Sequence, residues 1–285
     1  MPTELNKACQ QAFVVSHREN ISMLRNQLIL EGIQVQVVRG PYSKEQQSYS
    51  AIYRCLVNHA NAWRMVVKSE TLSIIVEADF VPVLGFGKLP LPVPVDRLDS
   101  SLIYLYACGP QFWDMPSSSK CARGHAGGMV AYVISPTVAT MMLDFFEEQC
   151  TANPSGAYAP WDAGVGYWLK ARGVESYLSY RQYGEHGGIA NPEHSKSGLG
   201  RPHQADTLTG PLAFLPFYAC GSFATFLTVR LRARMWGWVR LLAGRSLAWH
   251  DLVRTKPIRM FSFVAGRLMA PPHLHRFRFP SDKQS

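Results

Sequence analysis

Two carboxylates stand one residue apart at the end of an apolar run, in the octapeptide Ser73–Phe80 (SIIVEADF). Such a run of β-branched residues is typical of a strand that is buried on both faces of a parallel sheet. In an open α/β sheet the ligand crevice lies off the carboxyl ends of the strands. Glu77 and Asp79 are therefore placed to bind a hard divalent cation that also carries diphosphate oxygens. The alternative is a strand that ends in a solvated acidic loop.

Three further segments carry residue types that could do chemistry. His59 and Trp63 fall on the apolar face of a predicted helix, where a lone histidine is more often a core residue than a ligand. The paired glycines of 127–135 (GGMVAYVIS) would let the backbone approach a ligand, although an ordinary tight loop has the same pattern. Asp162 follows Trp161 at a predicted helix start, either as a helix cap or as a catalytic base that faces the crevice.

The elements that must position these residues begin with a β-α-β unit. The pattern predicts a strand at 12–16, a helix at 20–31 that Gly32 ends, and a second strand at 35–39. A long amphipathic helix at 49–68 then leads directly into the acidic strand.

After the acidic pair the pattern is less regular. The prolines and glycines of 81–95 predict irregular or extended chain, and 109–128 reads as a polar, mobile substrate loop. The Gly-, His- and Pro-rich residues 183–210 are expected to mark the end of the catalytic fold. The other predicted elements are strands at 101–106, 129–135 and 174–178 and helices at 136–149 and 161–171.

Length and composition allow one domain plus an extension. The chain has 285 residues, 47% of them hydrophobic, and we expect a domain at 1–200 and a basic extension at 201–285. Six scattered cysteines without a Cys-x-x-Cys pair argue against a zinc knuckle or a disulfide framework. The start of the sequence shows no secretory signal. Together these features favour the cytoplasm.

The net charge of +9 belongs to the extension. Residues 201–285 hold 13 Lys/Arg and 3 Asp/Glu, whereas residues 1–200 hold 16 and 17, so the first part carries −1 and the extension +10. This distribution is unlike a surface that wraps DNA, and we expect no nucleic-acid partner, although the Arg/Trp-rich extension leaves that alternative open.

The extension has the composition of a membrane-surface segment. Residues 207–229 carry no charge, and five arginines interleaved with tryptophans follow. We expect interfacial contact with anionic lipid through 207–260, at the cytoplasmic face of the inner membrane. A single membrane span and a packed or disordered extension are the alternatives.

The order of these parts resembles the family 25 glycosyltransferases, the lipooligosaccharide galactosyltransferase-like enzymes of bacterial lipopolysaccharide biosynthesis. The resemblance covers about 12–185 and rests on His59 and Trp63, on Glu77-Ala78-Asp79, on 128–135 and on Asp162. It implies a GT-A-type, Rossmann-like α/β sheet flanked by helices. Ala78 replaces the middle acid of the family's Glu-Asp-Asp, which leaves the expected cation with one oxygen ligand fewer.

The resemblance implies an inverting transfer of a hexose, galactose or a relative, from a UDP-sugar to a cell-surface glycan or a lipid-linked acceptor. It also implies Mn²⁺ or Mg²⁺ as the cation, and the expected metal ligands are Asp79 and Glu77. Asp162 is the expected catalytic base, with Asp114 and Glu185 as alternatives, and Arg123 and His125 are expected to close over the diphosphate from a loop. The alternative function is non-catalytic binding of a nucleotide sugar or glycan on the same fold. The residues expected to bind the nucleotide sugar are Ser16, His17, Arg18, His59, Glu77 and Arg123.

Overall fold

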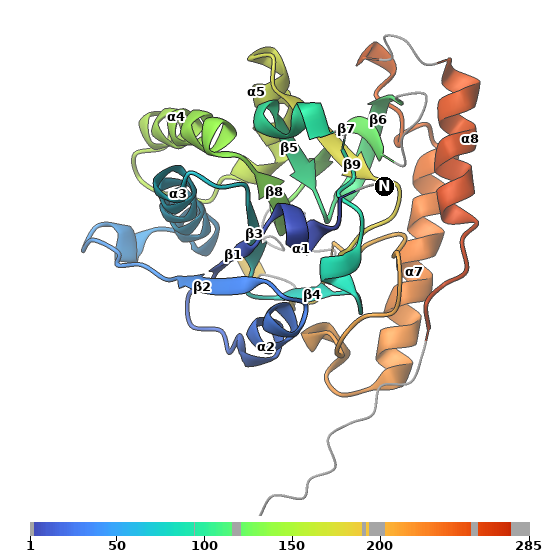
Figure 1. Ribbon diagram of the computed structural model, residues 1–285, viewed down its shortest axis with the longest axis horizontal. Coiled ribbons are helices and arrows are strands. Elements are labelled where there is room, and N and C mark those ends of the chain that lie inside the picture. Colours follow the sequence, from blue (N-terminus) through green and yellow to red (C-terminus); the bar gives the residue numbers. More distant parts are fainter. Residues whose placement is uncertain are drawn as a thin grey trace, which may run out of the picture.

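A mixed sheet of eight strands forms the centre of the molecule (Figure 1). The computed structural model describes residues 3–93, 95–115, 121–189, 192–193, 203–251 and 256–274. The strands of the sheet are β1 (Gln11–Val15), β2 (Gln34–Val38), β3 (Ser73–Glu77), β5 (Ser101–Tyr104), β6 (Cys108–Asp114), β7 (Cys121–Gly127), β8 (Ala131–Ile134) and β9 (Glu175–Ser179). They lie in the order β2-β1-β3-β8-β5-β9-β7-β6.

The strand order places the expected crevice between β1 and β3. Both β2 and β3 pair with β1 in parallel, one on each side, so the chain reverses its direction of winding at β1. Val15 is in register with Glu77, and the two strands therefore end together. Such a topological switch point is where open α/β sheets bind ligands. The sheet is not purely parallel, because β8 runs antiparallel to both β3 and β5.

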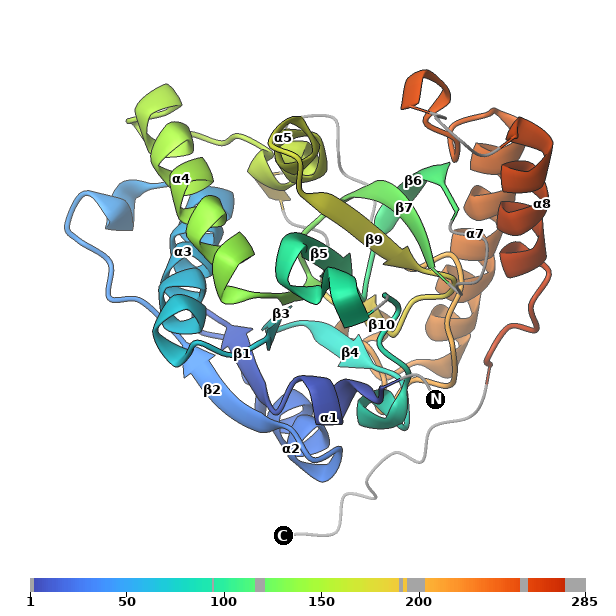
Figure 2. The ribbon, with the colours of Figure 1, turned by 45° about the horizontal axis from the view of Figure 1, so that its top comes forward.

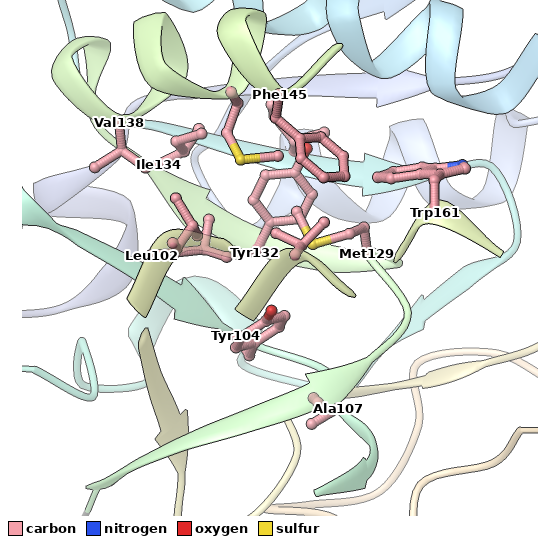
Figure 3. Packing of buried hydrophobic residues seen from close by; sticks show 14 of the residues in the cluster. Leu102, Tyr104, Ala107, Met129, Tyr132, Ile134, Val138, Phe145 and Trp161 are labelled. Carbon is pink, nitrogen blue, oxygen red and sulfur yellow. The ribbon is translucent and has the colours of Figure 1, made fainter. Parts of the chain in front are cut away.

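Helices cover both faces of the sheet, as Figure 2 shows. Alternate side chains of the central strands enter two separate apolar layers, which is why these strands read as continuous apolar runs. Figure 3 shows Tyr132, Phe145 and Trp161 in the layer between the sheet and α4. The helices are α1 (Leu5–Ala8), α2 (Ser22–Leu30), α3 (Ala51–Ser69), α4 (Pro136–Ala152), α5 (Val165–Ala171), α7 (Phe223–Leu242) and α8 (Pro257–Leu268).

Local sequence explains where the two longest helices of the first part begin. The hydroxyl of Ser50 accepts a hydrogen bond from the Tyr53 amide at the start of α3, and Ser135 does the same for Val138 at the start of α4. Pro136 occupies the first turn of α4, where its missing amide hydrogen is not needed. Both helices begin within two residues of the starts expected from the sequence.

One prediction for the middle of the chain is wrong. The stretch 109–128 is not a loop, because β6 and β7 pair antiparallel across it within the described residues. Its polar composition has a packing cause: a methyl group on Gly124 would lie 2.4 Å from the Gln111 carbonyl and 2.1 Å from the side chain of Leu178. The stretch 81–95, expected to be irregular or extended, begins with the end of a strand, β4 (Phe80–Pro82), which pairs with β10 (Gly184–His186), and continues as turns.

The described part of the C-terminal extension packs on the sheet. Isolated bridges join Phe112 to Leu247 and Gln182 to Leu208, and α7 contributes Phe226 and Leu241 to the two apolar layers. α7 and α8 lie side by side beyond β6 (Figures 1 and 2). No helix in the described ranges is both long enough and apolar enough to cross a membrane.

Candidate functional site

A cleft opens at the carboxyl ends of β1 and β3. It has a volume of about 180 Å³ and includes residues from the β1–α2 loop, from α3 and from the end of β3. The structure thus brings together four of the residues predicted from sequence. The side chains that line the cleft include Ser16, His17, Arg54, Cys55, Glu77 and Asp79.

A third potential ligand joins the two acids. β10 runs antiparallel to β4 and places the Nε2 atom of His186 3.0 Å from Oδ2 of Asp79. Ligand atoms of Glu77, Asp79 and His186 all lie within 4.8 Å of one another. The approach of β10 depends on Gly188, since a methyl group there would lie 2.1 Å from the Asp79 carboxylate.

The charge state of this cluster follows from its partners. Burial opposes ionisation of both groups, but the Asp79 carboxylate outweighs it and raises the pKa of His186 to about 9. His186 in turn lowers the pKa of Asp79 despite its burial. The second oxygen of Asp79, Oδ1, is buried and has no hydrogen-bond partner among the described residues. Metal binding would have to displace the Nε2 proton of His186, because only a neutral imidazole ligates a metal. Once that proton is lost, two carboxylates, one imidazole and an unpaired buried oxygen fit a divalent cation such as Mn²⁺.

A chain of hydrogen bonds orients Glu77 from behind. The indole Nε1 of Trp63 donates to the hydroxyl of Tyr132 over 2.8 Å, and that oxygen lies 2.9 Å from Nδ1 of His59. Nε2 of His59 lies 3.2 Å from a Glu77 carboxylate oxygen. The Tyr132 hydroxyl accepts from Trp63 and can donate its one proton to Nδ1 of His59, which leaves Nε2 of His59 to donate to Glu77. His59 is fully buried and thus positions Glu77 rather than lining the cleft.

The β1–α2 loop contributes side chains rather than backbone amides to the cleft. The carboxylate of Glu19 accepts hydrogen bonds from the amides of His17 (2.6 Å) and Arg18 (3.0 Å) and from the Ser16 hydroxyl (3.0 Å). Those amides would otherwise form an anion-binding nest. Arg39 also bonds to Ser16, through Nε over 3.2 Å.

Three arginines surround His17. Burial lowers the pKa of this histidine, and the charges of Arg18, Arg54 and Arg39 lower it further, while Glu19 opposes them. The ring of Tyr42 lies 5.4 Å from that of His17, measured between ring centroids. Cations beside a pair of rings would suit a ligand with a flat base and phosphates.

Asp162 lies near the same edge of the sheet. It belongs to a 3₁₀ turn at Trp161–Gly164, and a methyl group on Gly128 would lie 4.0 Å from its Oδ2 atom. Burial raises the pKa of the Cys55 thiol well above its usual value, and the charges of Glu77, Asp162 and Asp79 add to this effect. Asp162 is therefore within electrostatic range of the acid cluster.

The structure does not bring every predicted residue to the cleft. Arg123 lies on β7, where it forms ion pairs with Asp114 (3.1 Å) and Glu175 (3.0 Å), and it is not in a closing loop. His125 is in the same strand and is buried against Tyr167. Burial lowers its pKa to about 4.

Glu185, the other alternative base, is fully buried and ion-paired with Arg230 of α7. It also accepts hydrogen bonds from the backbone amides of Ala205 (2.8 Å) and His186 (3.1 Å). These contacts give Glu185 a structural role, because they supply hydrogen-bond and charge partners to a carboxylate that solvent does not reach.

Sequence reasoning missed His186 and Arg54. His186 stands in 183–210, which has little hydrophobic periodicity, and its pairing with Asp79 depends on a short strand returning across the sheet. The spacing of Arg54 on α3, one turn before Asn58 and on the side of the helix that faces β1, was a usable signal.

No known protein family matches the chain, and no curated protein shows significant similarity to it. The function of the site is therefore inferred from its residues and geometry.

Proposed function

We propose that the protein is a divalent-metal-dependent glycosyltransferase that uses a nucleotide sugar, of the kind represented by the family 25 enzymes. The observation that carries this proposal is the cluster of Glu77, Asp79 and His186 at the switch point of the sheet, beside a cleft bordered by arginines. A cation site next to cationic side chains suits a ligand with a diphosphate. UDP-galactose is the first nucleotide sugar to test, and only the resemblance to the family 25 enzymes supports this choice.

In this proposal the cluster holds Mn²⁺ or Mg²⁺, which would neutralise the negative charge that develops on the leaving diphosphate. His186 supplies the third ligand that Ala78 does not. His59 keeps the Glu77 carboxylate in position through the hydrogen-bond chain that ends at Trp63. Ser16, His17 and Arg54 contact the nucleotide from the β1 side.

Asp162 takes the role of general base. The hydroxyl oxygen of the acceptor forms a bond to the anomeric carbon, and its proton passes to the Asp162 carboxylate. The bond between the anomeric carbon and the phosphate oxygen breaks, and the electron pair leaves with the nucleoside diphosphate. Attack opposite the leaving group inverts the anomeric centre.

Hydrolysis of the nucleotide sugar tests this proposal without knowledge of the acceptor. Purified protein with Mn²⁺ and UDP-galactose should release UDP, and EDTA should abolish the release. Asp79→Asn should reduce the rate by roughly 100-fold or more through loss of a cation ligand. Asp144→Asn, an exposed position on α4, is the matched control.

A panel of other UDP-sugars covers the case in which galactose is not the transferred sugar. Binding of Mn²⁺ and nucleotide without hydrolysis of any of them would favour the alternative, a non-catalytic nucleotide-sugar or glycan-binding protein.

The second element of the proposal is a surface for anionic lipid on α7 and α8. Lys256 and Arg259 are exposed beside apolar side chains that face solvent. Exposed apolar area flanked by cations matches the headgroup region of an anionic membrane, which would hold the cleft near a lipid-linked acceptor. The exposed apolar residues are Leu231, Met235, Leu242, Ile258, Phe261 and Met269.

A further inference from the structure

A second and larger cleft lies between the sheet and α7. Its volume is about 870 Å³, and it is bounded by the start of β6 on one side and by α7 on the other. None of its residues belongs to the predicted cation or nucleotide site. The side chains that line this cleft include Cys108, His203, Arg232, Trp236, Arg240 and Arg245.

The cleft carries a local excess of positive charge. Its lining includes three guanidinium groups, whereas its carboxylate, Asp206, is already held by Arg267 through two hydrogen bonds of 2.6 and 2.9 Å. Within the described ranges no hydrogen bond or ion pair engages the guanidinium group of Arg232 or Arg245. A ligand of this cleft should therefore be anionic.

The cleft also contains polar atoms that lack partners. Arg240 is fixed by a 2.8 Å hydrogen bond to the Gly109 carbonyl, and the absence of a side chain at Gly109 allows this approach. Its Nε atom is nevertheless buried and unpaired among the described residues, as is Nε2 of Gln204. Buried donors without acceptors are rare in folded proteins, and here they belong to two residues that line one cleft. Oxygen-rich ligands would supply the acceptors.

α7 divides its surface between three environments. Positions such as Phe226, Ala233 and Leu241 face the interior. Leu231, Met235 and Leu242 face solvent on the surface assigned above to lipid. Between these two faces, at positions one turn apart, Arg232, Trp236 and Arg240 line the cleft. An indole beside cations matches a sugar ring that carries an acidic group.

One end of the cleft lies close to Asp162, the proposed base. Nδ1 of His203 lies 3.1 Å from Sγ of Cys108, and both residues line the cleft. A methyl group on Gly128 would lie 3.8 Å from the Cβ atom of Cys108 and 4.0 Å from Oδ2 of Asp162. Cys108 and the proposed base are thus on either side of one glycine.

Tyr106 links the cleft to the cation cluster. Its hydroxyl donates a hydrogen bond to the backbone carbonyl of His203, and its ring lies 6.1 Å from that of His186 between centroids. The end of the cleft at Cys108 and His203 is therefore the end nearest to Asp162 and the cation ligands.

We propose that this cleft is the acceptor subsite and that it takes a phosphorylated sugar, with the phosphate on Arg232 and Arg245 and the sugar ring against Trp236. The assignment of this cleft as an acceptor subsite rests on the proposed glycosyl transfer. Binding of a phosphorylated sugar to the cleft can nevertheless be measured without a nucleotide sugar or a cation. The phosphate can belong to a soluble sugar phosphate or to a lipid headgroup. The lipid surface on the neighbouring face of α7 favours the second source.

Calorimetric titration of the full-length protein with glucose 1-phosphate tests the subsite. Glucose 1-phosphate should bind more tightly than inorganic phosphate or glucose alone, because only it offers both charge and ring. Arg232→Ala and Arg245→Ala should each weaken binding about tenfold, as expected for a charge-assisted hydrogen bond. Trp236→Ala should remove most of the preference over inorganic phosphate.

Two control variants separate this cleft from other sites. Arg259→Ala removes an exposed cation of α8 that does not line the cleft and should leave binding unchanged. Arg54→Ala alters the nucleotide cleft and should also leave it unchanged. Two results would overturn the proposal. One is equal affinity for glucose 1-phosphate in the wild type, Arg232→Ala and Arg245→Ala. The other is a loss of affinity in the Arg259→Ala control as large as that in the cleft variants.

The two sources of phosphate are distinguished with phosphatidylcholine vesicles that do or do not contain phosphatidylinositol, whose headgroup is a phosphorylated ring. Binding that needs phosphatidylinositol and falls in Arg232→Ala identifies the lipid source, and binding of the soluble sugar phosphate alone identifies the other.

Failure of the subsite and failure of the transfer proposal give different results. UDP-galactose hydrolysis with no binding of glucose 1-phosphate removes the subsite only. Binding in the cleft without any hydrolysis of nucleotide sugars supports the subsite as a phosphosugar site and removes its role as an acceptor site.

Discussion

His186 Nε2 lies 3.0 Å from Asp79 Oδ2, and this contact closes the cation cluster across two strands that are far apart in the chain. It is fixed from both sides, because His186 pairs with Phe80 in the β4–β10 ladder and the Gly187 amide donates to the Asp79 carbonyl over 2.8 Å. In the proposed cation site, an imidazole held in this way would supply the ligand that Ala78 does not.

The first prediction concerns cation affinity. His186→Ala should weaken Mn²⁺ binding by roughly 10- to 100-fold, because it removes one of three ligands. Titration with Mn²⁺ monitored by electron paramagnetic resonance measures the free ion directly. His250→Ala, a histidine outside the cluster, serves as the control. Unchanged affinity in His186→Ala would mean that the cation, if bound, sits elsewhere.

A second prediction concerns the hydrogen-bond chain behind Glu77. Tyr132→Phe removes the hydroxyl that joins Trp63 to His59 and should lower Mn²⁺ affinity about tenfold, although Tyr132 does not contact the cleft. A merely structural role would lower thermal stability alone. Tyr104→Phe is the matched control, since Tyr104 is buried in the same layer and its hydroxyl has no recorded partner among the described residues. Equal Mn²⁺ affinities in the two variants contradict the prediction.

The buried pair of Asp206 and Arg267 provides a test of stability. Arg267 is 1% exposed, so Asp206→Asn would leave a buried charge without its partner and should cost about 3–5 kcal/mol of unfolding free energy. Replacing both residues, as Asp206→Asn with Arg267→Met, should recover most of that loss. Urea denaturation of the single and double variants measures both effects. A double variant no more stable than Asp206→Asn argues against charge burial as the cause.

Folding stability should depend on pH through His125. The pKa of this buried histidine is about 4 in the folded protein, against 6.5 for an ordinary histidine. Between these values the unfolded state binds a proton that the folded state does not, so stability falls as pH drops from 6.5 toward 4, by up to about 3 kcal/mol. His125→Phe keeps the ring against Tyr167 and should remove this component. Urea midpoints at pH 7 and pH 5 compare the two proteins; parallel losses would show that other groups are responsible.

The lipid surface is tested by substitution. Leu242 and Ile258 are each 75% exposed, so replacing both with serine should leave the fold intact and reduce flotation with vesicles that contain anionic lipid. Leu30→Ser, on α2 and 81% exposed, is the control on another face. Flotation that persists in the double variant removes these helices from the membrane contact. A change in oligomeric state instead of flotation would assign the surface to a second copy of the chain.

The parts of the fold that follow from local pattern were predictable. β1, α2, β2, α3 and β3 each have a clear period and a cap or stop residue, and they were placed within two residues of their observed ends. β6 and β7 were not, because their sequences (CGPQFWD and CARGHAG) are rich in glycine and polar residues, and at Gly124 close packing leaves no room for a side chain. Their alternation carries no hydrophobic signal.

The candidate site was predictable only where neighbouring segments form it. Ser16, Glu77 and Asp79 meet because parallel strands end at one edge, a rule that needs no distant contact. His186 joins them through the β4–β10 ladder, whose two strands are separated in the sequence by most of the strands of the main sheet. Nothing near His186 in the sequence indicates that pairing. Arg123 was misplaced for a related reason, since its partners Asp114 and Glu175 are defined by the sheet.

The ion pair of Arg230 with Glu185 makes the folding of β10 depend on a helix that is synthesised later. Until α7 has left the exit tunnel, Glu185 has no counter-charge, and the strand that presents His186 would have to bury an uncompensated carboxylate. The cleft at β1 and β3 is built from residues synthesised much earlier. A nascent chain should therefore form this cleft first and bring His186 to Asp79 only near the end of its synthesis.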